Sequence, residues 1–269
     1  MFELDELKAQ EFLAKNNITD YHIIKVAGDA SFRSYYRVTR PEGSLILMFA
    51  PPSHGELLPF IKIDGILLEH GFSVPKIFSI DEVEGFMLLE DFGDDTYNKV
   101  LTKNNNAADV ELALYQKACD CLIEIHKVKA PRNVSLYDKD LLLREVLLFT
   151  DWYLAFKEIT ISQQDVTLFK KLWLDLFEQI SQENQVLVLR DYHADNLMTL
   201  PQRNGYKQVG LLDFQDAVIG SKAYDLVSLL EDARRDLHEE NRHKLFDYYL
   251  EKSGCDKEAF IKDYEILSL

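Results

Sequence analysis

Two short apolar runs, each followed within two positions by an aspartate, constrain the fold of this chain most strongly. The first is VLVL at residues 186–189, followed by Arg190 and Asp191, and the second is VGLL at residues 209–212, followed by Asp213. Apolar runs of this length between polar residues are typical of buried strands. We therefore expect two short buried strands that each deliver a carboxylate to the loop at their end.

The spacing within these two loops indicates phosphoryl transfer. Four residues separate Asp191 from Asn196, as in the catalytic loop of kinases, and Asp213-Phe214-Gln215 stands where a kinase carries Asp-Phe-Gly. Phosphoryl transfer depends mainly on positioning and charge neutralisation. We predict that Asp191 is the catalytic base, which orients and deprotonates an acceptor hydroxyl, and that Asn196 and Asp213 bind Mg²⁺. The predicted cofactors are ATP and Mg²⁺.

The periodicity of the chain changes near residue 90. We expect a helix at 4–15, three antiparallel strands between 21 and 50, a helix at 59–71 and two more strands at 74–83 and 85–93; helical patterns then dominate at 108–128, 138–156, 164–180, 221–236, 238–254 and 256–269. The predicted fold class is α+β, a bilobal protein-kinase-like fold. Residues 1–90 would form a small antiparallel-sheet lobe that binds the nucleotide, and residues 91–269 a larger, mainly helical lobe for catalysis and the acceptor.

The first lobe contains candidate nucleotide contacts. Gly28 and Ser31 lie in a turn between two predicted strands, where backbone N–H groups and a hydroxyl can cover phosphates. An ordinary hairpin turn is the alternative reading. Leu88 and Glu90 belong to the segment that joins the lobes, where kinases bind the adenine ring.

The helical part adds candidates around the loop and the acceptor. Arg190 and Asp225 are predicted to brace the catalytic loop, although Asp225 also suits an ordinary helix start. The next four residues share a predicted role at the acceptor. They are His193, Asp195, Trp152 and Tyr153. Core packing is the alternative for Trp152 and Tyr153. A zinc site at His193 is a further alternative, but the oxygen-rich side chains around it suit Mg²⁺ better than zinc.

Composition excludes several classes of protein. A formal charge of −16 argues against a nucleic-acid partner. An acidic surface can attract cationic acceptors such as aminoglycosides, but it also serves solubility. Three cysteines without metal-ligand spacing predict reduced thiols. The chain has no apolar run of membrane-spanning length, and its start, MFELDELKAQ, lacks the features of a signal peptide, so we expect a cytoplasmic monomer with no membrane partner.

The chain resembles the aminoglycoside phosphotransferase-like kinases over nearly its whole length. Within them it is most similar to the bacterial branch that phosphorylates the anomeric hydroxyl of N-acetylmuramate and N-acetylglucosamine. The resemblance rests on GDASFRSYYRV at 28–38, APP at 50–52, GFMLLEDFGD at 85–94, DWYL at 151–154, RDYHADNLM at 190–198 and DFQDAVIGSKAYDLVSLLED at 213–232. It implies a sugar kinase in peptidoglycan recycling, with ATP and an amino sugar as its small-molecule partners.

The sequence also departs from the family pattern. Met48 stands where most kinases place a lysine that binds the α- and β-phosphates, so the phosphate charge would have to be met by Arg33 or Lys25. The chain also stops at DYEILSL, where the sugar kinases continue. Two alternatives therefore stay open: a kinase for aminoglycosides or other amino alcohols, and a nucleotide-binding pseudokinase without catalytic activity.

Overall fold

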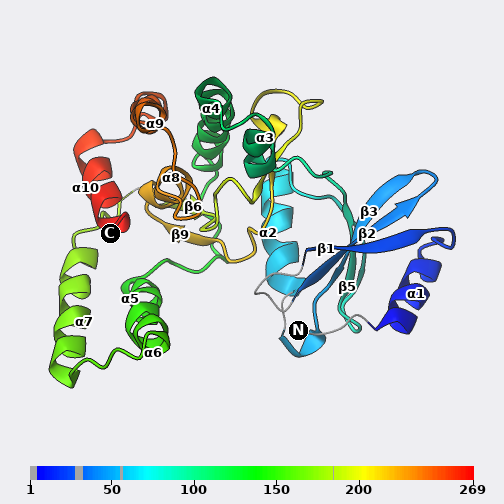
Figure 1. Ribbon diagram of the computed structural model, residues 1–269, viewed down its shortest axis with the longest axis horizontal. Helices are drawn as coiled ribbons and strands as arrows, with labels where there is room; N and C mark the ends of the chain where they lie inside the picture. The colour runs from blue at the N-terminus through cyan, green and yellow to red at the C-terminus, as the bar shows by residue number, and fades with distance from the viewer. Residues whose placement is uncertain (1–4, 28–32, 55–56, 184) are drawn as a thin grey trace. The chain divides into compact units, whose positions relative to one another are not determined.

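The computed structural model describes residues 5–27, 33–54, 57–183 and 185–269. The chain divides into two compact units, each built from two chain segments (Figure 1). The sheet unit comprises Met1–Asn105 and Ala194–Asp216, and the helical unit comprises Asn106–His193 and Ala217–Leu269. The polar loop after residue 189 thus contributes to both units, because the chain passes from one to the other between His193 and Ala194.

A five-stranded antiparallel sheet forms the centre of the sheet unit, in the order β1-β2-β3-β5-β4. Its strands are β1 (His22–Ala27), β2 (Ser34–Arg40), β3 (Gly43–Phe49), β4 (Ile77–Asp81) and β5 (Phe86–Glu90). β-branched and aromatic residues favour these strands. Glycine at the first position of β3, with φ of 120°, allows the tight β2–β3 turn that a side chain would strain.

Alternate residues of the sheet face opposite sides. Leu45, Leu47 and Leu88 pack in one core cluster with Phe12 and Leu13 of α1 (Glu6–Lys15), which covers that face. Asp5 begins α1 by accepting a hydrogen bond from Lys8 N, and Asn16 ends it. The intervening strand positions face the other side of the sheet, because strand side chains alternate.

A hairpin and two helices complete the sheet unit. These elements are α2 (Leu57–Glu69), α3 (Tyr97–Lys103), β7 (Leu197–Thr199) and β8 (Val209–Leu211), with short 3₁₀ turns at Pro52–His54 and Gly205–Gln208. β7 and β8 run antiparallel, so the start of β7 lies beside the end of β8. Leu212 N donates to Asn196 O over 3.0 Å, which places the polar residues at these two strand ends side by side.

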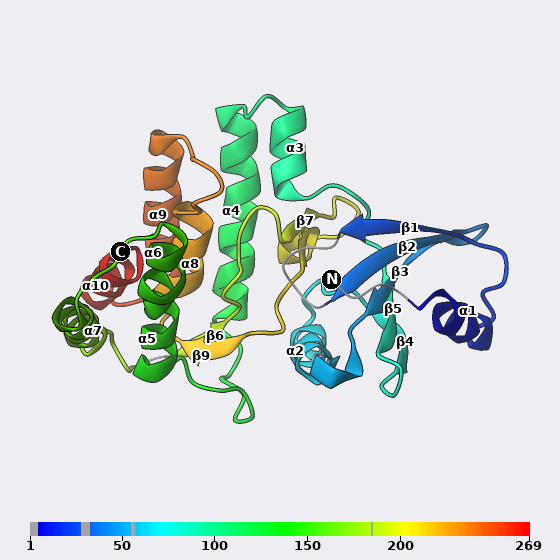
Figure 2. The same cartoon turned by 60° about the horizontal axis from the view of Figure 1, so that its bottom comes forward.

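The helical unit consists mainly of α-helices (Figure 2). Its helices are α4 (Ala108–Ile125), α5 (Lys139–Leu148), a π-helical turn (Phe149–Tyr153), α6 (Leu154–Phe156), α7 (Gln163–Phe177), α8 (Ala223–Leu230), α9 (Glu239–Ser253) and α10 (Lys257–Leu267). α4 packs against α9, α8 against α10 and α5 against α7. One core cluster joins α5, α7 and α10 to the strand pair described next.

The catalytic-loop sequence follows the first strand of a buried strand pair in this unit. β6 (Val186–Val188) pairs antiparallel with β9 (Val218–Gly220), and all six residues are buried. Because Val188 pairs with Val218, the loop after β6 begins where β9 begins. Tyr137 N donates to Ile219 O over 2.8 Å and extends the pairing by one more segment.

The predicted fold class is confirmed. The antiparallel sheet and the helical remainder have the order expected from the sequence, and both short apolar runs are strands. Their partners, β7 and β9, were not predicted, because neither belongs to a four-residue apolar run like those of β6 and β8. The functional division at residue 90 remains a prediction. No helix among the described residues is long and apolar enough to cross a membrane.

Candidate functional site

A cavity of about 300 Å³ lies within the sheet unit. Its wall combines apolar side chains from the sheet with polar ones from the loops. The polar or charged lining residues are Arg33, Tyr35, Arg37, Glu90, Asp91, Asp94, Thr96, Lys99, Asp195, Asn196 and Asp213, and the apolar ones include Val26, Ile46, Phe60, Leu89, Phe92, Met198, Leu212 and Phe214. A cavity lined by both apolar and charged side chains suits a nucleotide base and its phosphates.

Asp213 and Asn196 are the two predicted metal ligands, and both line this cavity. Asp213 Oδ1 accepts hydrogen bonds from Arg33 Nη2 and Gln215 Nε2, each over 3.0 Å. The Asp213 side chain is 43% exposed, whereas that of Arg33 is only 5% exposed. The carboxylate thus keeps an accessible side while a buried guanidinium orients it.

The backbone at Asp213 has a positive φ of 56°. This left-handed conformation is uncommon for a residue other than glycine, and such strain tends to occur at functional sites. One carboxylate and one amide oxygen form a donor set that suits Mg²⁺, since this ion keeps several waters and phosphate oxygens as further ligands. The residues present therefore fit the predicted metal.

Arg37 on β2 holds the segment that follows β5. Its Nε and Nη2 donate to both oxygens of Asp91, over 2.6 and 3.0 Å, and its Nη1 donates to Asp94 over 2.9 Å. Burial raises the pKa of Asp91, but its hydrogen bonds from Arg37, Ser44 and Gly93 outweigh this and lower it. Sequence reasoning missed Arg37, because its partners lie 54 and 57 positions away.

The predicted nucleotide contacts have different surroundings. Glu90 lines the cavity, and its Oε1 accepts a hydrogen bond from Arg203 Nη2 over 2.6 Å. Leu88 packs on the α1 side of the sheet, and its neighbour Leu89 lines the cavity. Met48 is fully buried and pairs with Met87 across the strands. The predicted contacts Gly28 and Ser31 lie outside the described residues.

A second cavity, of about 320 Å³, lies within the helical unit and contains the predicted base Asp191. Polar side chains dominate its wall. The lining residues are Arg190, Asp191, His193, Tyr224, Val227, Ser228, Glu231, Asp232, Ala233, Arg234, Leu267 and Ser268. A polar cavity of this size suits a small hydroxylated molecule.

Asp225 on α8 holds the chain just before Asp191. Its two carboxylate oxygens accept hydrogen bonds from the backbone N–H groups of Leu189, over 2.7 Å, and Arg190, over 2.9 Å. Asp225 is completely buried, which raises its pKa to about 7 even though both backbone donors favour the charged form. Ser228, one turn further along α8, donates to Arg190 O over 2.8 Å.

The backbone of Arg190 is also in the left-handed region, with φ of 73°. Its Nη2 donates to Glu145 of α5, and Tyr137 donates its hydroxyl to the same carboxylate. The guanidinium lies 5.8 Å from the centre of the Tyr137 ring. Glu145 of α5 thus bonds the side chain of this residue, while the side chains of Asp225 and Ser228 on α8 bond its backbone.

Charges in the second cavity are largely paired. Asp232 Oδ1 accepts from the backbone N–H of Arg234, over 3.0 Å, and from its Nη1, over 3.2 Å. Glu231 Oε1 accepts from Arg242 Nη1 and from the Tyr264 hydroxyl, each over 2.8 Å. The cavity therefore offers a balanced set of hydrogen-bonding groups rather than a concentration of negative charge.

The residues predicted to contact the acceptor are divided among three places. His193 is buried and lines the second cavity. Asp195 lines the cavity of the sheet unit, where Asn98 Nδ2 donates to it over 2.6 Å. Trp152 and Tyr153 belong to the π-helical turn, are 73% and 51% exposed, and are not among the residues that line the second cavity.

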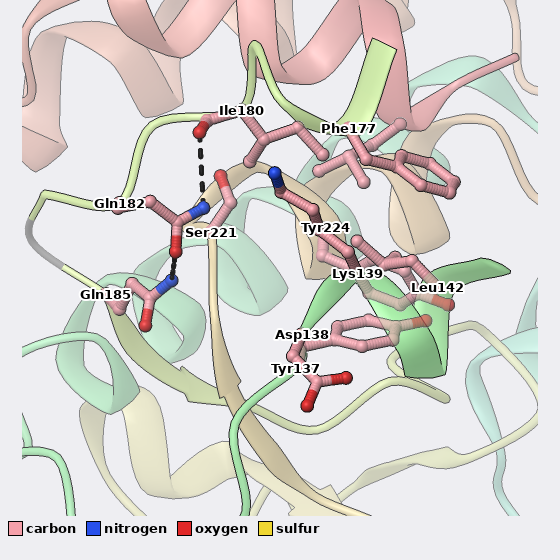
Figure 3. Close-up of a pocket in the computed structure, with 11 residues that line it drawn as sticks. Tyr137, Asp138, Lys139, Leu142, Phe177, Ile180, Gln182, Gln185, Ser221 and Tyr224 are labelled. Atoms are coloured by element: carbon pink, nitrogen blue, oxygen red, sulfur yellow. Dashed lines mark hydrogen bonds between the residues drawn. The ribbon is translucent and has the colours of Figure 1, made fainter. Parts of the chain in front are cut away.

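A third cavity, of about 200 Å³, also lies in the helical unit (Figure 3). Phe177 and Leu142 form part of its apolar wall. On another side, Gln185 Nε2 donates to Gln182 Oε1 over 3.0 Å, and Gln182 Nε2 donates to Ile180 O over 3.2 Å. The predicted site residues do not line this cavity, and we assign it no chemistry.

The two loops and the five-stranded sheet define the class of the protein. An antiparallel sheet followed by helices, with Asp191 and Asn196 in one loop and Asp213 after a second strand, is the architecture of the protein-kinase-like phosphotransferases. Among solved structures, an ADP-bound aminoglycoside phosphotransferase, APH(2'')-Ib, has a TM-score of 0.68 at 14% identity and covers 98% of this chain and 86% of its own. The choline kinase LicA from Streptococcus pneumoniae has a TM-score of 0.66 at 14% identity, and the match covers 97% of this chain and 85% of its own.

The chain belongs to the phosphotransferase enzyme family APH, whose family model matches residues 22–261. An N-acetylmuramate/N-acetylglucosamine kinase from Caulobacter vibrioides is 33% identical over 95% of this chain and 80% of its own length. A protein of the same name from Pseudomonas aeruginosa is 36% identical over 93% of this chain and 72% of its own length. The predicted family resemblance is confirmed.

Proposed function

We propose that this protein transfers the γ-phosphoryl group of Mg-ATP to the anomeric hydroxyl of N-acetylmuramate or N-acetylglucosamine. The observation that carries the proposal is that Asp191, the predicted base, opens onto a polar cavity large enough for one sugar. The names of relatives at 33% and 36% identity support the same substrates. A role in recycling peptidoglycan sugars follows from this proposal.

The proposed chemistry assigns a role to each loop. Asp191 orients the anomeric hydroxyl and accepts its proton as the sugar oxygen attacks the γ-phosphorus, and the bond to the bridging oxygen of ADP breaks. Asn196 and Asp213 would hold Mg²⁺, which neutralises charge on the phosphates. Arg33 would take over part of the phosphate-binding role of the lysine that Met48 replaces.

Two features of the second cavity, which Asp191 lines, favour a sugar acceptor over a polycationic one. Two of its three acidic residues, Glu231 and Asp232, are paired with arginines, so few carboxylates remain to neutralise several ammonium groups. Serine, arginine and acidic side chains can all bond sugar hydroxyls. The aminoglycoside phosphotransferases among the solved structures share the fold at 13–17% identity, which supports the architecture and not the acceptor.

The test is ADP release by the purified protein with Mg-ATP and each of four acceptors: N-acetylmuramate, N-acetylglucosamine, an aminoglycoside and choline. Turnover is expected with the two sugars only. Asp191→Asn should reduce it by at least about 10²-fold, whereas Asp140→Asn, an exposed carboxylate of the same unit, should leave it unchanged.

The product distinguishes the anomeric position from the other hydroxyls. A sugar 1-phosphate releases inorganic phosphate in mild acid, whereas a 6-phosphate ester resists the same treatment. Release of phosphate supports the anomeric assignment. Phosphorylation of the aminoglycoside or choline alone would contradict the proposal, and nucleotide binding without turnover on any acceptor would favour the pseudokinase alternative.

A further inference from the structure

Arg234 is a cationic side chain at the wall of the cavity that contains Asp191. It lies in the turn after α8, and its side chain is 58% exposed, so its guanidinium is open to solvent and to a ligand. Only its Nη1 donates to a described side chain, namely Asp232. Because a guanidinium carries five N–H donors, most of its donors are not engaged by the described residues.

Asp232 holds this arginine in place. The side chain of Asp232 is only 2% exposed, and it accepts bonds from both the backbone and the side chain of Arg234. A buried carboxylate costs free energy unless it is paired, so the contact favours one orientation of the arginine. The guanidinium is thus held at Nη1, and the side chain that carries its other donors stays 58% exposed.

The other cation of the cavity is already engaged. Arg190 donates to Glu145 and lies against the Tyr137 ring, which leaves Arg234 as the more accessible of the two lining arginines. An exposed, oriented guanidinium beside a substrate cavity is the usual means of binding a carboxylate, through two parallel hydrogen bonds. The two proposed sugars differ in one such group, because N-acetylmuramate carries a lactyl ether with a carboxylate and N-acetylglucosamine has a hydroxyl there.

We infer that Arg234 binds the lactyl carboxylate of N-acetylmuramate and so sets the preference between the two sugars. The inference rests on the proposed function. It makes Arg234 a specificity-determining residue: the contribution of its charge appears only with the acidic sugar. Asp232 then acts indirectly, by positioning the guanidinium.

The test compares kcat/KM for both sugars in Arg234→Gln, Arg234→Lys and the unmodified protein. For Arg234→Gln we expect kcat/KM on N-acetylmuramate to fall roughly 10- to 100-fold, the range of one charge-assisted hydrogen bond, mainly through KM. The value on N-acetylglucosamine should change by less than about 3-fold. Arg234→Lys should restore part of the loss, since it keeps the charge without the planar fork.

Arg132→Gln is the matched control, because it removes one exposed arginine from the same unit away from the cavity. Thermal unfolding of each variant verifies that it folds. Raised salt should weaken the binding of N-acetylmuramate more than that of N-acetylglucosamine. Equal loss on both sugars, or loss on neither, would overturn the inference while leaving the sugar-kinase proposal intact. Absence of turnover with either sugar in the unmodified protein would overturn both.

Discussion

Arg33 donates a hydrogen bond from Nη2 to Asp213 Oδ1 over 3.0 Å, although they lie 180 positions apart in the chain. The pair joins the end of the β1–β2 connection to the loop after β8, and both residues line the cavity of the sheet unit. A buried cation thus lies against the proposed metal ligand, in the cavity that we propose holds the nucleotide. Met48 provides no charge there.

The first prediction concerns this pair. Arg33→Gln should raise KM for ATP by about 10-fold, because a charged hydrogen bond to the phosphates and to Asp213 is lost. Lys15→Gln removes an equally positive but 68% exposed side chain of the same unit and should have little effect. The measurement is initial rate against ATP concentration at saturating sugar. An unchanged KM for ATP would show that Arg33 does not bind the phosphates.

The second prediction concerns Asp225. Asp225→Asn replaces one acceptor oxygen with an NH₂ group, so one of the backbone donors at Leu189 and Arg190 loses its partner, at a cost of about 1–3 kcal/mol. We expect lower stability and a fall in kcat of at least about 10-fold, measured by thermal unfolding and steady-state kinetics. Ser228→Ala removes one weaker contact to the same loop and should have a smaller effect. Full activity in Asp225→Asn would exclude the brace.

The third prediction is a pH dependence of stability caused by Asp64. This residue of α2 is 2% exposed, its Oδ1 accepts no hydrogen bond from the described residues, and burial raises its pKa to about 7. Below about pH 4 the folded and unfolded states are both protonated. Between about pH 4 and 7 only the unfolded state ionises, so the free energy of unfolding falls by up to about 1.4 kcal/mol per pH unit.

Asp64→Asn should therefore raise the melting temperature at pH 8 and leave it nearly unchanged at pH 4. Asp225 has a similarly raised pKa, so part of the slope should persist in the variant. Asp20→Asn, an exposed carboxylate of the same unit, serves as the control. A parallel shift of the melting curve at all pH values would contradict this assignment.

The fourth prediction concerns thiol reactivity. Cys119 and Cys121 are fully buried in α4, and burial raises the pKa of both, that of Cys121 to about 12. Cys255 is partly exposed. Because the thiolate is the reactive form, a chromogenic disulfide reagent should modify one thiol in the folded protein and three in denaturant. Rapid modification of more than one would show that α4 opens readily.

Much of the fold could be predicted from local sequence. Short apolar runs ending in polar residues identified β6 and β8, and helical periodicity identified the long helices, because both signals arise within a few residues of chain. β7 and β9 were not predicted. All four of these strands have only three residues, but β7 and β9 lack the four-residue apolar runs that identified β6 and β8, and each forms because a partner from elsewhere in the chain supplies its hydrogen bonds.

The candidate site likewise combines residues that the sequence predicts with contacts that only the structure shows. Asp191, Asn196 and Asp213 stand out in sequence because kinase chemistry requires these residue types at this spacing. Other parts of the site join positions far apart in the chain. They are the contacts of Arg37 with Asp91 and Asp94, the pair of Arg33 with Asp213, and the cavity wall around Arg234. No local pattern contains that information.

The sequence by itself determined the class of fold and the order of the reactive residues, because hydrophobic period and motif spacing are properties of a continuous segment. Tertiary structure alone decided which charges are paired, which carboxylates are buried and which face of the sheet each side chain occupies. Those properties depend on the distances between groups that chain folding brings together, and electrostatic and desolvation energies follow these distances and not sequence separation.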